Sequence, residues 1–367
     1  MAKRIIISGG GTGGHIFPAI AIANALKKID DKTEILFVGA KGRMEMEKVP
    51  AAGYSIIGLD IQGFQRSSLL KNVFLPFKII GSILKSLSII KNFKPDAVVG
   101  VGGYASGPLL YAASLKKVPY LIQEQNSYAG ITNKYLGKNA EKVCVAFDNM
   151  QAFFKADKLI KTGNPVRENA IDVIGKRQEA MDFFELDSTK KTVLVVGGSL
   201  GAGTLNNSMM AGLSTFQSAD VQLIWQTGKY YYKSIIERYG NQPKDNGIRI
   251  YEFLNRMDLA FAASDVIISR AGAGTIAELC LVNKPVILVP SPNVAEDHQT
   301  KNANALVSKK AAVLIADKHA ESELVDQTLK LLSDKELMDN LIRNIAALGL
   351  PNADEQIAKE VIKIANQ

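Results

Sequence analysis

The stretch "RIIISGGGTGGHIFPAIAIANAL", from Arg4 to Leu26, decides the fold. It begins with a short β-branched run, passes through a glycine-rich turn and continues with apolar residues at helical spacing, which predicts a strand, a tight turn and a helix. Small residues in such a turn let main-chain N–H groups approach an anion, and the helix that follows adds its positive end. The stretch therefore predicts a phosphate-binding βα unit with His15 near the helix start.

Short apolar runs of this kind alternate with helical patterns along the chain, which indicates βαβ units and parallel sheets. The runs are Arg4–Ser8, Glu34–Val38, Ala97–Val101, Tyr120–Gln123, Val143–Ala146, Thr192–Val196, Val221–Gln226, Ile248–Phe253, Val266–Ser269 and Val286–Val289.

The second half of the chain repeats the plan of the first. "RIIISGGGTGG" is echoed by "TVLVVGGSLGA", "PDAVVGVGGYASG" by "SDVIISRAGAGT", and "VPYLIQEQN" by "KPVILVPSPN". The order predicts two Rossmann-like, doubly wound α/β domains of similar topology, although any two α/β domains are alike at this level. We place them at 1–162 and 163–344, because Gly163, Asn164 and Pro165 punctuate the chain. Ligands of open parallel sheets bind beyond the carboxyl ends of the strands, so we expect the chemistry in a cleft between the domains.

Composition narrows the class of protein. The net charge of +8 favours an anionic partner, which is nucleic acid, a membrane surface or a phosphorylated substrate. The only two cysteines, Cys144 and Cys280, lie far apart in apolar segments, which favours a reducing cytosol over a disulfide framework. The start of the chain lacks a signal-peptide pattern, and no run of eighteen apolar residues predicts a membrane span.

The first glycine turn is formally a dinucleotide fingerprint, because Gly9, Gly11 and Gly14 satisfy G-x-G-x-x-G. An NAD site also needs an acidic residue at the end of the second strand to bind the ribose, and this chain has "GAK" there, which disfavours NAD. Lys41 and Arg43 could still bind a ribose that carries a phosphate, so a phosphorylated dinucleotide is not excluded. A nucleoside-triphosphate-binding loop needs Lys at the position of His15, so this turn is not expected to bind ATP in that way.

Three further turns have the same character: "GVGGYASG", "GGSLGAG" and "RAGAGTIAE". Each alone is satisfied by a ligand-free strand–helix turn, but four together favour anion or sugar binding.

Seven motifs carry a resemblance to a known family: "GGGTGGHIFPAIAIANAL", "GVGGYASGP", "QEQNSYAGITNKYL", "TGNPVR", "GGSLGA", "SRAGAGTIAEL" and "DHQTKNA". In order and spacing, over nearly the whole chain, they resemble the MurG family of UDP-N-acetylglucosamine (UDP-GlcNAc) transferases, which convert lipid I to lipid II in peptidoglycan synthesis. The resemblance implies a GT-B fold and an inverting, β-1,4-forming transfer to N-acetylmuramoyl-pentapeptide on pyrophosphoryl-undecaprenol. It also implies that the carboxy-terminal segment, 345–367, packs back on the amino-terminal domain.

The resemblance implies a donor site held mostly by the second domain. Its residues would be Thr12, Gly13, Gly14, Asn126, Arg167, Ser199 at the diphosphate, the Leu254 backbone near uracil, Ala273, Gly274, Thr275, Ile276, Ala277, Glu278 at the ribose, and Gln299 and Asn302 at the sugar. Gly103 and Tyr104 would lie on the acceptor side. Gly203 departs from the family pattern, since a larger, often basic residue commonly follows "GGSLGA", so the phosphate contacts of that turn stay open.

Inverting transfer needs a base for the acceptor hydroxyl and a way to stabilise the departing diphosphate. His15 is the candidate base, because imidazole titrates near neutrality and a helix start keeps it neutral; the alternative is a histidine that only orients substrate. Glu278 is a competing base, His298 a donor-sugar contact and His319 a surface residue. The chain has no Asp-x-Asp and no clustered His or Cys, so we expect no cofactor and no protein-held metal, with main-chain N–H groups and Arg167 stabilising the leaving group.

The segment from Ile61 to Pro95 predicts membrane contact. It has six basic residues and no acidic one, namely Arg66, Lys71, Lys78, Lys85, Lys91 and Lys94, beside the apolar Leu70, Phe74, Phe77, Ile80, Leu84 and Leu87. Such an amphipathic basic segment suits anionic lipid, although an internal helix of an α/β domain also has one apolar face. Pro76 breaks or starts a helix here, so we expect two short helices rather than one.

We therefore expect a peripheral enzyme on the cytoplasmic face of the inner membrane, with UDP-GlcNAc, lipid I and the anionic membrane surface as partners and no nucleic acid. The rivals are a related enzyme with another acceptor such as diacylglycerol, a UDP-GlcNAc epimerase, and a catalytically silent dinucleotide- or nucleic-acid-binding module.

Overall fold

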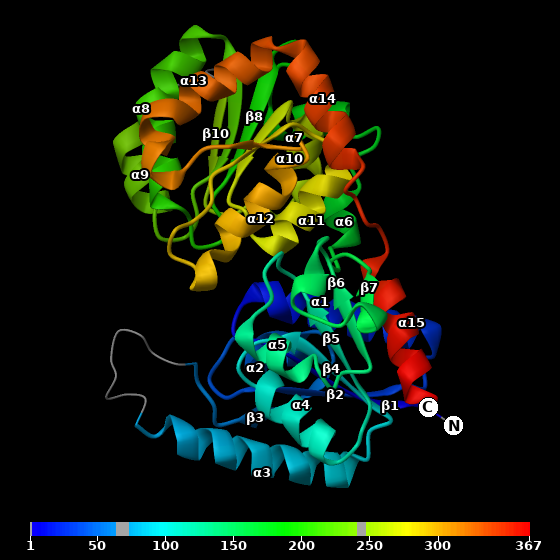
Figure 1. Ribbon diagram of the computed structural model, residues 1–367. Helices are drawn as coiled ribbons and strands as arrows, with labels where there is room; N and C mark the ends of the chain where they lie inside the picture. Colours follow the sequence, from blue (N-terminus) through cyan, green and yellow to red (C-terminus); the bar gives the residue numbers. More distant parts are fainter. Residues whose placement is uncertain (1, 64–72, 241–246) are drawn as a thin grey trace. The chain divides into compact units, whose positions relative to one another are not determined.

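The structure is a computed structural model that describes residues 2–63, 73–240 and 247–367 (Figure 1). The chain divides into two compact units. Unit 1 comprises 1–166 and 350–367, and unit 2 comprises 167–349. The divisions fall after residues 166 and 349, four and five residues beyond the boundaries at 162 and 344 that the sequence predicts.

Unit 1 is built on one parallel sheet of seven strands in the order β3-β2-β1-β4-β5-β6-β7. The strands are β1 (Arg4–Gly9), β2 (Glu34–Ala40), β3 (Ser55–Leu59), β4 (Ala97–Gly102), β5 (Tyr120–Glu124), β6 (Lys142–Val145) and β7 (Leu159–Lys161). The helices are α1 (Gly13–Ile29), α2 (Glu45–Ala51), α3 (Leu75–Phe93), α4 (Ser106–Leu115), α5 (Ile131–Leu136) and α15 (Ala353–Ala365), with short 3₁₀ turns η2 (Met150–Ala152) and η3 (Ala156–Lys158).

Alternate residues of β1 serve the two faces of this sheet, and both faces are covered. Ile5 and Ile7 belong to a core with Val361 of α15, whereas Ile6 belongs to a second core with Leu109 of α4. A strand buried on both sides must be apolar throughout, which is why the run "RIIIS" decides the fold. The carboxy-terminal helix thus supplies core to the unit that begins the chain (Figure 1).

Unit 2 has a parallel sheet of six strands in the order β10-β9-β8-β11-β12-β13. The strands are β8 (Lys191–Val196), β9 (Val221–Gln226), β10 (Ile248–Tyr251), β11 (Val266–Ser269), β12 (Val286–Leu288) and β13 (Val313–Leu314). The helices are α6 (Glu168–Ile171), α7 (Arg177–Phe184), α8 (Gly203–Ser218), α9 (Tyr232–Tyr239), α10 (Met257–Ala263), α11 (Ala273–Val282), α12 (His298–Val307), α13 (Ala320–Ser333) and α14 (Lys335–Ala346), with η5 (Ala295–Asp297) and η6 (Asp317–His319).

The two sheets share one topology. In each, the third, second, first, fourth, fifth and sixth strands of the unit follow in that order, and unit 1 adds a seventh. The three sequence echoes fall on equivalent strands: β1 and β8 are the first, β4 and β11 the fourth, β5 and β12 the fifth. The predicted pair of doubly wound domains is therefore confirmed.

Two sequence-based expectations need correction. The strands β3, β7 and β13 were not predicted, and all three lie at sheet edges. The prediction of two short helices around Pro76 is wrong within the described residues, because Leu75–Phe93 forms one helix with Pro76 in its first turn. Proline fits there, since the first amides of a helix have no intrahelical acceptor. Arg66, Leu70 and Lys71 lie outside the described residues.

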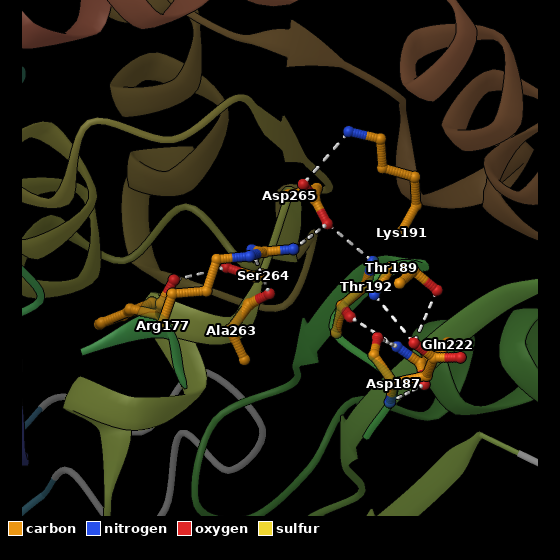
Figure 2. Close-up of polar contacts among 10 residues, drawn as sticks. Arg177, Asp187, Thr189, Lys191, Thr192, Gln222, Ala263, Ser264 and Asp265 are labelled. Atoms are coloured by element: carbon orange, nitrogen blue, oxygen red, sulfur yellow. Dashed lines mark hydrogen bonds and ion pairs between the residues drawn. The ribbon is translucent and has the colours of Figure 1, made fainter. Parts of the chain in front are cut away.

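A carboxylate whose side chain is 13% exposed ties together the amino ends of the central strands in unit 2 (Figure 2). Asp265, just before β11, accepts hydrogen bonds from the Thr192 amide of β8 at 2.8 Å and from Arg177 of α7 at 3.3 Å. Lys191 lies 3.4 Å from its other oxygen, and Arg177 also donates to the Ala263 carbonyl at 3.0 Å. One side chain thus connects α7, β8 and β11 at the sheet edge opposite the glycine turns.

Replacing this carboxylate is expected to destabilise unit 2. Asp265→Asn should lower the free energy of unfolding by about 1–3 kcal/mol, because Arg177 and Lys191 lose a charged partner. Asp220→Asn, which breaks an exposed pair with Lys190, should cost about 1 kcal/mol or less. Trp225, the single tryptophan, is fully buried in β9, so its fluorescence during urea unfolding reports on unit 2. Equal midpoint shifts in the two variants would contradict the assignment.

Candidate functional site

The first glycine turn lies at the carboxyl end of β1. Gly11 has a φ of +85°, and α1 begins two residues later. The His15 and Ile16 amides both bind the Thr12 carbonyl, at 3.1 and 3.2 Å. Among the described residues, the amides of Gly13 and Gly14 have no hydrogen-bond acceptor. The helix start therefore presents main-chain donors, as the sequence predicts for an anion site.

The turn after β4 meets this first turn through bare backbone. The register of β1 and β4 shifts between Ser8 and Gly9, so that Gly9 pairs with Gly102. A Cβ atom at Gly102 would lie 2.7 Å from Nε2 of His15, and one at Gly103 would meet the Gly10 carbonyl. The half-buried His15 ring thus rests on Gly102, with Nδ1 3.4 Å from the Thr12 hydroxyl.

Tyr104 follows the same turn and completes a group with His15. Its ring packs on the backbone of Gly63, beyond β3, and a Cβ at Gly11 would lie 3.9 Å from it. The Arg43 guanidinium lies 6.0 Å from the ring centre. Tyr104 is 47% exposed, so one side remains open to a ligand. The structure therefore brings together the predicted residues Thr12 to His15, Gly103 and Tyr104.

A buried carboxylate that could not be recognised from the sequence binds backbone amides of the first turn. Glu45, 1% exposed, accepts hydrogen bonds from the Gly11 and Ala40 amides, both at 2.9 Å. A Cβ at Gly10 would collide with its carboxylate. The acidic residue sought for an NAD ribose at the end of the second strand is thus present five residues on, but it binds the protein's own backbone. Nothing in its sequence context distinguishes it from an exposed helix-start glutamate.

Glu124 plays the same role at the end of β5. It is 1% exposed and accepts from the amides of Asn126 at 3.0 Å and Gly130 at 3.1 Å, and from the Asn133 side chain at 2.8 Å. This carboxylate fixes the loop that carries the predicted residue Asn126 at the carboxyl edge of the sheet.

In unit 2 the glycine turn after β8 lines a cavity of about 530 Å³. Its lining combines the turn with the loops after β11 and β12. The lining residues include Gly197, Gly198, Gly201, Gly203, Thr204, Tyr231, Arg270, Gly272, Thr275, Ser291, Asn293, Gln299 and Asp317. The predicted Thr275 and Gln299 are in this set. Ser199 is exposed in the same turn but is not one of the lining residues.

Two side chains of α12 clamp the turn between β11 and α11. Gln299 Oε1 accepts from the amides of Ala271 at 3.2 Å and Ser291 at 2.8 Å, and Asn302 donates to the Ala271 carbonyl at 3.4 Å. The Gln299 amide nitrogen makes no hydrogen bond within the described residues, so it can donate to a ligand. α11 then begins at Ala273, so the predicted segment from Ala273 through Gly274, Thr275, Ile276 and Ala277 to Glu278 forms its first two turns.

Glu278 and Arg167 form an ion pair within unit 2. Arg167 approaches only Oε1, at 3.3 and 3.4 Å, which leaves Oε2 as an acceptor. Burial raises the pKa of the Glu278 carboxyl above its ordinary value, and Arg167 opposes the rise. The predicted Leu254, 3% exposed, lies beyond β10, where its amide donates to Gln226 at 2.9 Å.

The sequence analysis also missed Arg270 and Asp317, which form an ion pair of 2.5 Å in the cavity. Arg270 donates further to the carbonyls of Val289 and Pro290, and Asp317 accepts from the Thr204 hydroxyl at 3.0 Å. His298 lies 3.7 Å from Glu296, and His319 lies on the surface 3.8 Å from Glu323. The described residues contain no group of three or more His, Cys, Asp or Glu side chains arranged to hold a metal.

Unit 1 has a second notable surface on α3, α4 and α5, which pack in that order. Its exposed apolar side chains are Phe74, Phe77, Ile80 and Leu84 on α3, Leu115 on α4, and Ile131 and Tyr135 on α5. Leu87 instead packs on the core. Lys78 pairs with Asp60 at 3.2 Å and Lys85 donates to the Gly58 carbonyl at 2.8 Å. None of the helices in the described ranges could span a bilayer.

Comparison with known proteins places this geometry in a family. Models of the glycosyltransferase family 28 N-terminal and C-terminal domains match residues 5–145 and 192–357. A relative from Parabacteroides distasonis, named UDP-N-acetylglucosamine–N-acetylmuramyl-(pentapeptide) pyrophosphoryl-undecaprenol N-acetylglucosamine transferase, is 55% identical over 99% of both chains. A Flavobacterium psychrophilum relative of the same name is 52% identical over 98% of this chain and 97% of its own. The chain belongs to the MurG family.

The solved structure of Acinetobacter baumannii MurG agrees, with a TM-score of 0.80 at 29% identity over 98% of this chain and 99% of the other. The two units of the chain are thus the two Rossmann-like domains of a GT-B glycosyltransferase. The family and fold class that the seven motifs predict are confirmed. The individual roles of the site residues stay predictions.

Removing the carboxylate beneath the MurG-family glycine turn is expected to loosen that turn. In Glu45→Ala the buried amides of Gly11 and Ala40 lose their acceptor, so hydrogen–deuterium exchange should quicken in peptides covering residues 9–15 and 38–42. Glu47→Ala is the matched control, because Glu47 lies on the same helix with a side chain 78% exposed. Unchanged exchange in Glu45→Ala would show that the turn holds itself.

Proposed function

We propose that this protein transfers GlcNAc from UDP-GlcNAc to the C4 hydroxyl of MurNAc-pentapeptide on pyrophosphoryl-undecaprenol, converting lipid I to lipid II. The observation that carries the proposal is a chain matched end to end by relatives of that name, with the motif residues gathered at the carboxyl edges of both sheets. Those edges are where open parallel sheets bind ligands.

Unit 2 would bind the donor. Its cavity joins the start of α8 to the loops that precede α11 and α12, so a diphosphate there meets helix N-termini. Glu278 Oε2 would accept from the ribose hydroxyls and the Gln299 amide nitrogen would donate to the sugar. The Leu254 backbone would contact uracil through its carbonyl, because its amide is bonded to Gln226. Ser199, Asn302 and the α11 segment from Ala273 to Ala277 would also belong to the donor site. From unit 1, the proposed donor contacts are Thr12, Gly13, Gly14 and Asn126.

Unit 1 would bind the acceptor and remove its proton. In a single inverting displacement the acceptor oxygen forms a bond to the anomeric carbon as the bond from that carbon to the UDP oxygen breaks, which gives a β-1,4 linkage. The acceptor proton passes to His15, whose ring the glycine turn and Gly102 hold in place. Main-chain amides and Arg167 stabilise the departing UDP, and no protein-held metal takes part.

The apolar surface of α3, α4 and α5 would contact the membrane from the cytoplasmic side. Phe77 and Ile131 are each 72% exposed there. The net charge also favours unit 1 as the membrane-contacting unit. Unit 1 has 24 of the 44 Lys and Arg residues and 14 of the 36 Asp and Glu residues, a net charge of +10. Unit 2 has 20 Lys and Arg residues and 22 Asp and Glu residues, a net charge of −2. Exposed apolar side chains on a cationic unit suit an anionic lipid surface, where the acceptor lies.

Transfer of labelled GlcNAc from its UDP donor to a short-chain lipid I analogue tests the function. The wild-type protein should form the disaccharide, also in EDTA. His15→Ala should lower kcat by about 10²–10⁴-fold, the usual contribution of a positioned base, with UDP affinity unchanged. His319→Ala, at the exposed histidine of unit 2, should retain wild-type kcat.

Other results would redirect the proposal. Donor binding without transfer to lipid I would favour another acceptor, and conversion of UDP-GlcNAc alone would favour epimerisation. A raised acceptor KM with near-normal kcat in His15→Ala would make His15 an orienting residue, and loss of activity in EDTA with rescue by magnesium would contradict metal independence.

Vesicle co-sedimentation tests the membrane surface. The wild-type protein should bind anionic phosphatidylglycerol vesicles at low salt, and Phe77→Asp with Ile80→Asp should weaken binding more than tenfold, since each side chain contributes roughly 1.5–3 kcal/mol when buried. Ile174→Asp, at a residue of unit 2 that is 92% exposed, is the matched control. Failure of the wild-type protein to bind would remove the membrane proposal.

A further inference from the structure

Tyr231 covers the glycine turn of unit 2 from the cavity side. A Cβ atom at Gly201 would lie 2.6 Å from Cδ2 of its ring, and one at Gly203 would lie 3.1 Å from its hydroxyl oxygen. Tyr231 also lines the cavity, together with both glycines. The absent side chains of the turn are therefore what make room for this ring and bring its hydroxyl to the start of α8.

Backbone contacts fix the ring in this place. The Lys229 amide donates to the Ser199 carbonyl at 3.1 Å, and the Tyr230 amide to the Leu200 carbonyl at 3.4 Å. The turn that carries Tyr231 is thus bonded directly to the glycine turn. Tyr231 itself precedes α9 and donates its amide to the Gly228 carbonyl at 3.2 Å. These bonds hold the backbone of Tyr231, and the packing of its ring against Gly201 and Gly203 places the hydroxyl.

The charges of the cavity make a neutral donor valuable there. Arg270 is the only cation among the lining residues, and Asp317 pairs with it at 2.5 Å. The carbonyls of Val289 and Pro290 accept from the same Nη1 atom that contacts Asp317, so Nε and Nη2 of Arg270 make no hydrogen bond within the described residues. An anion in this cavity therefore meets an arginine whose charge is balanced by Asp317, and neutral amides and hydroxyls add to the N–H groups that Arg270 still has.

Two of the five lining hydroxyl groups already donate within the protein, whereas Ser291 only accepts a hydrogen bond, from the Asn293 amide at 3.4 Å. The Thr204 hydroxyl donates to Asp317, and that of Ser269 to the Arg270 carbonyl. Within the described residues the hydroxyls of Tyr231 and Thr275 make no hydrogen bond, and the amides of Gly203 and Thr204 are likewise without an acceptor. Tyr231 thus faces the two free amides that begin α8.

We propose that the Tyr231 hydroxyl donates a hydrogen bond to a phosphate oxygen of the nucleotide diphosphate bound in this cavity. The proposal rests on the proposed function, which brings a UDP-sugar to unit 2. It also accounts for a glycine at position 203, because a larger side chain there would displace the hydroxyl. Tyr231 is then a donor-binding residue that the sequence comparison alone does not mark.

Calorimetric titration of the full-length protein with UDP and with uridine tests this. Tyr231→Phe keeps the ring and removes only the hydroxyl, so UDP should bind about tenfold more weakly, as expected for the loss of a hydrogen bond to a charged group. Uridine, which has no phosphate, should bind as it does to the wild-type protein. Tyr230→Phe is the matched control, because Tyr230 is the adjacent tyrosine, 72% exposed and not part of the cavity lining.

The outcomes separate the two proposals. If wild-type protein binds no UDP, the proposed function fails and this inference falls with it. If wild-type protein binds UDP and Tyr231→Phe binds it equally well, the inference alone is overturned. Equal weakening of UDP and uridine would also overturn it, because the tyrosine would then shape the cavity without contacting phosphate.

Discussion

In both units the ligand-facing turns touch one another through backbone that has no side chain. In unit 1 a Cβ at Gly103 would strike the Gly10 carbonyl, and in unit 2 a Cβ at Gly228 would strike the amide of Gly201. Gly103, Gly201 and Gly228 have φ values of +89°, +93° and +81°. Both the space and the dihedral angles therefore require glycine. His15 on Gly102 and Tyr231 on Gly201 owe their positions to these contacts.

Bare backbone brings many amides together, and buried side chains decide which of them remain for a ligand. Glu45 takes the amides of Gly11 and Ala40, Glu124 those of Asn126 and Gly130. In unit 2 the amide of Leu254 goes to Gln226, and Gln299 takes two more. The amides left free within the described residues include those of Gly13 and Gly14 in α1 and of Gly203 and Thr204 in α8, where donors point along the helix axis toward an anion. Removal of one of these acceptor side chains would leave a buried amide without a partner. That would lower the stability and add an amide that is not directed at the ligand.

The sequence predicts the inner strands and the edge strand β10 because each has a mostly apolar run, but it misses the other three edge strands. β3, β7 and β13 each close one side of a sheet, and none is buried along its whole length. An edge strand this short has neither a continuous apolar run nor a clear alternation. The turns with their glycines are equally visible, so His15, Tyr104 and Gln299 can be named from motifs. Glu45, Asp317 and Tyr231 cannot, because their roles arise from contacts with residues distant in sequence.

The net charge of +8 illustrates how a whole-chain property can mislead about a site. It suggests an anionic ligand, and a nucleotide diphosphate is anionic, yet the cavity proposed to hold it has one arginine already paired with one aspartate. The excess lies in unit 1, at +10, while unit 2 stands at −2. Oriented amides and hydroxyls can bind phosphate without a cation, because their dipoles are fixed before the ligand arrives. Exposed lysines act over a Debye length and suit a charged surface. The two kinds of positive potential therefore suit the two proposed ligands, the nucleotide for unit 2 and the anionic membrane surface for unit 1.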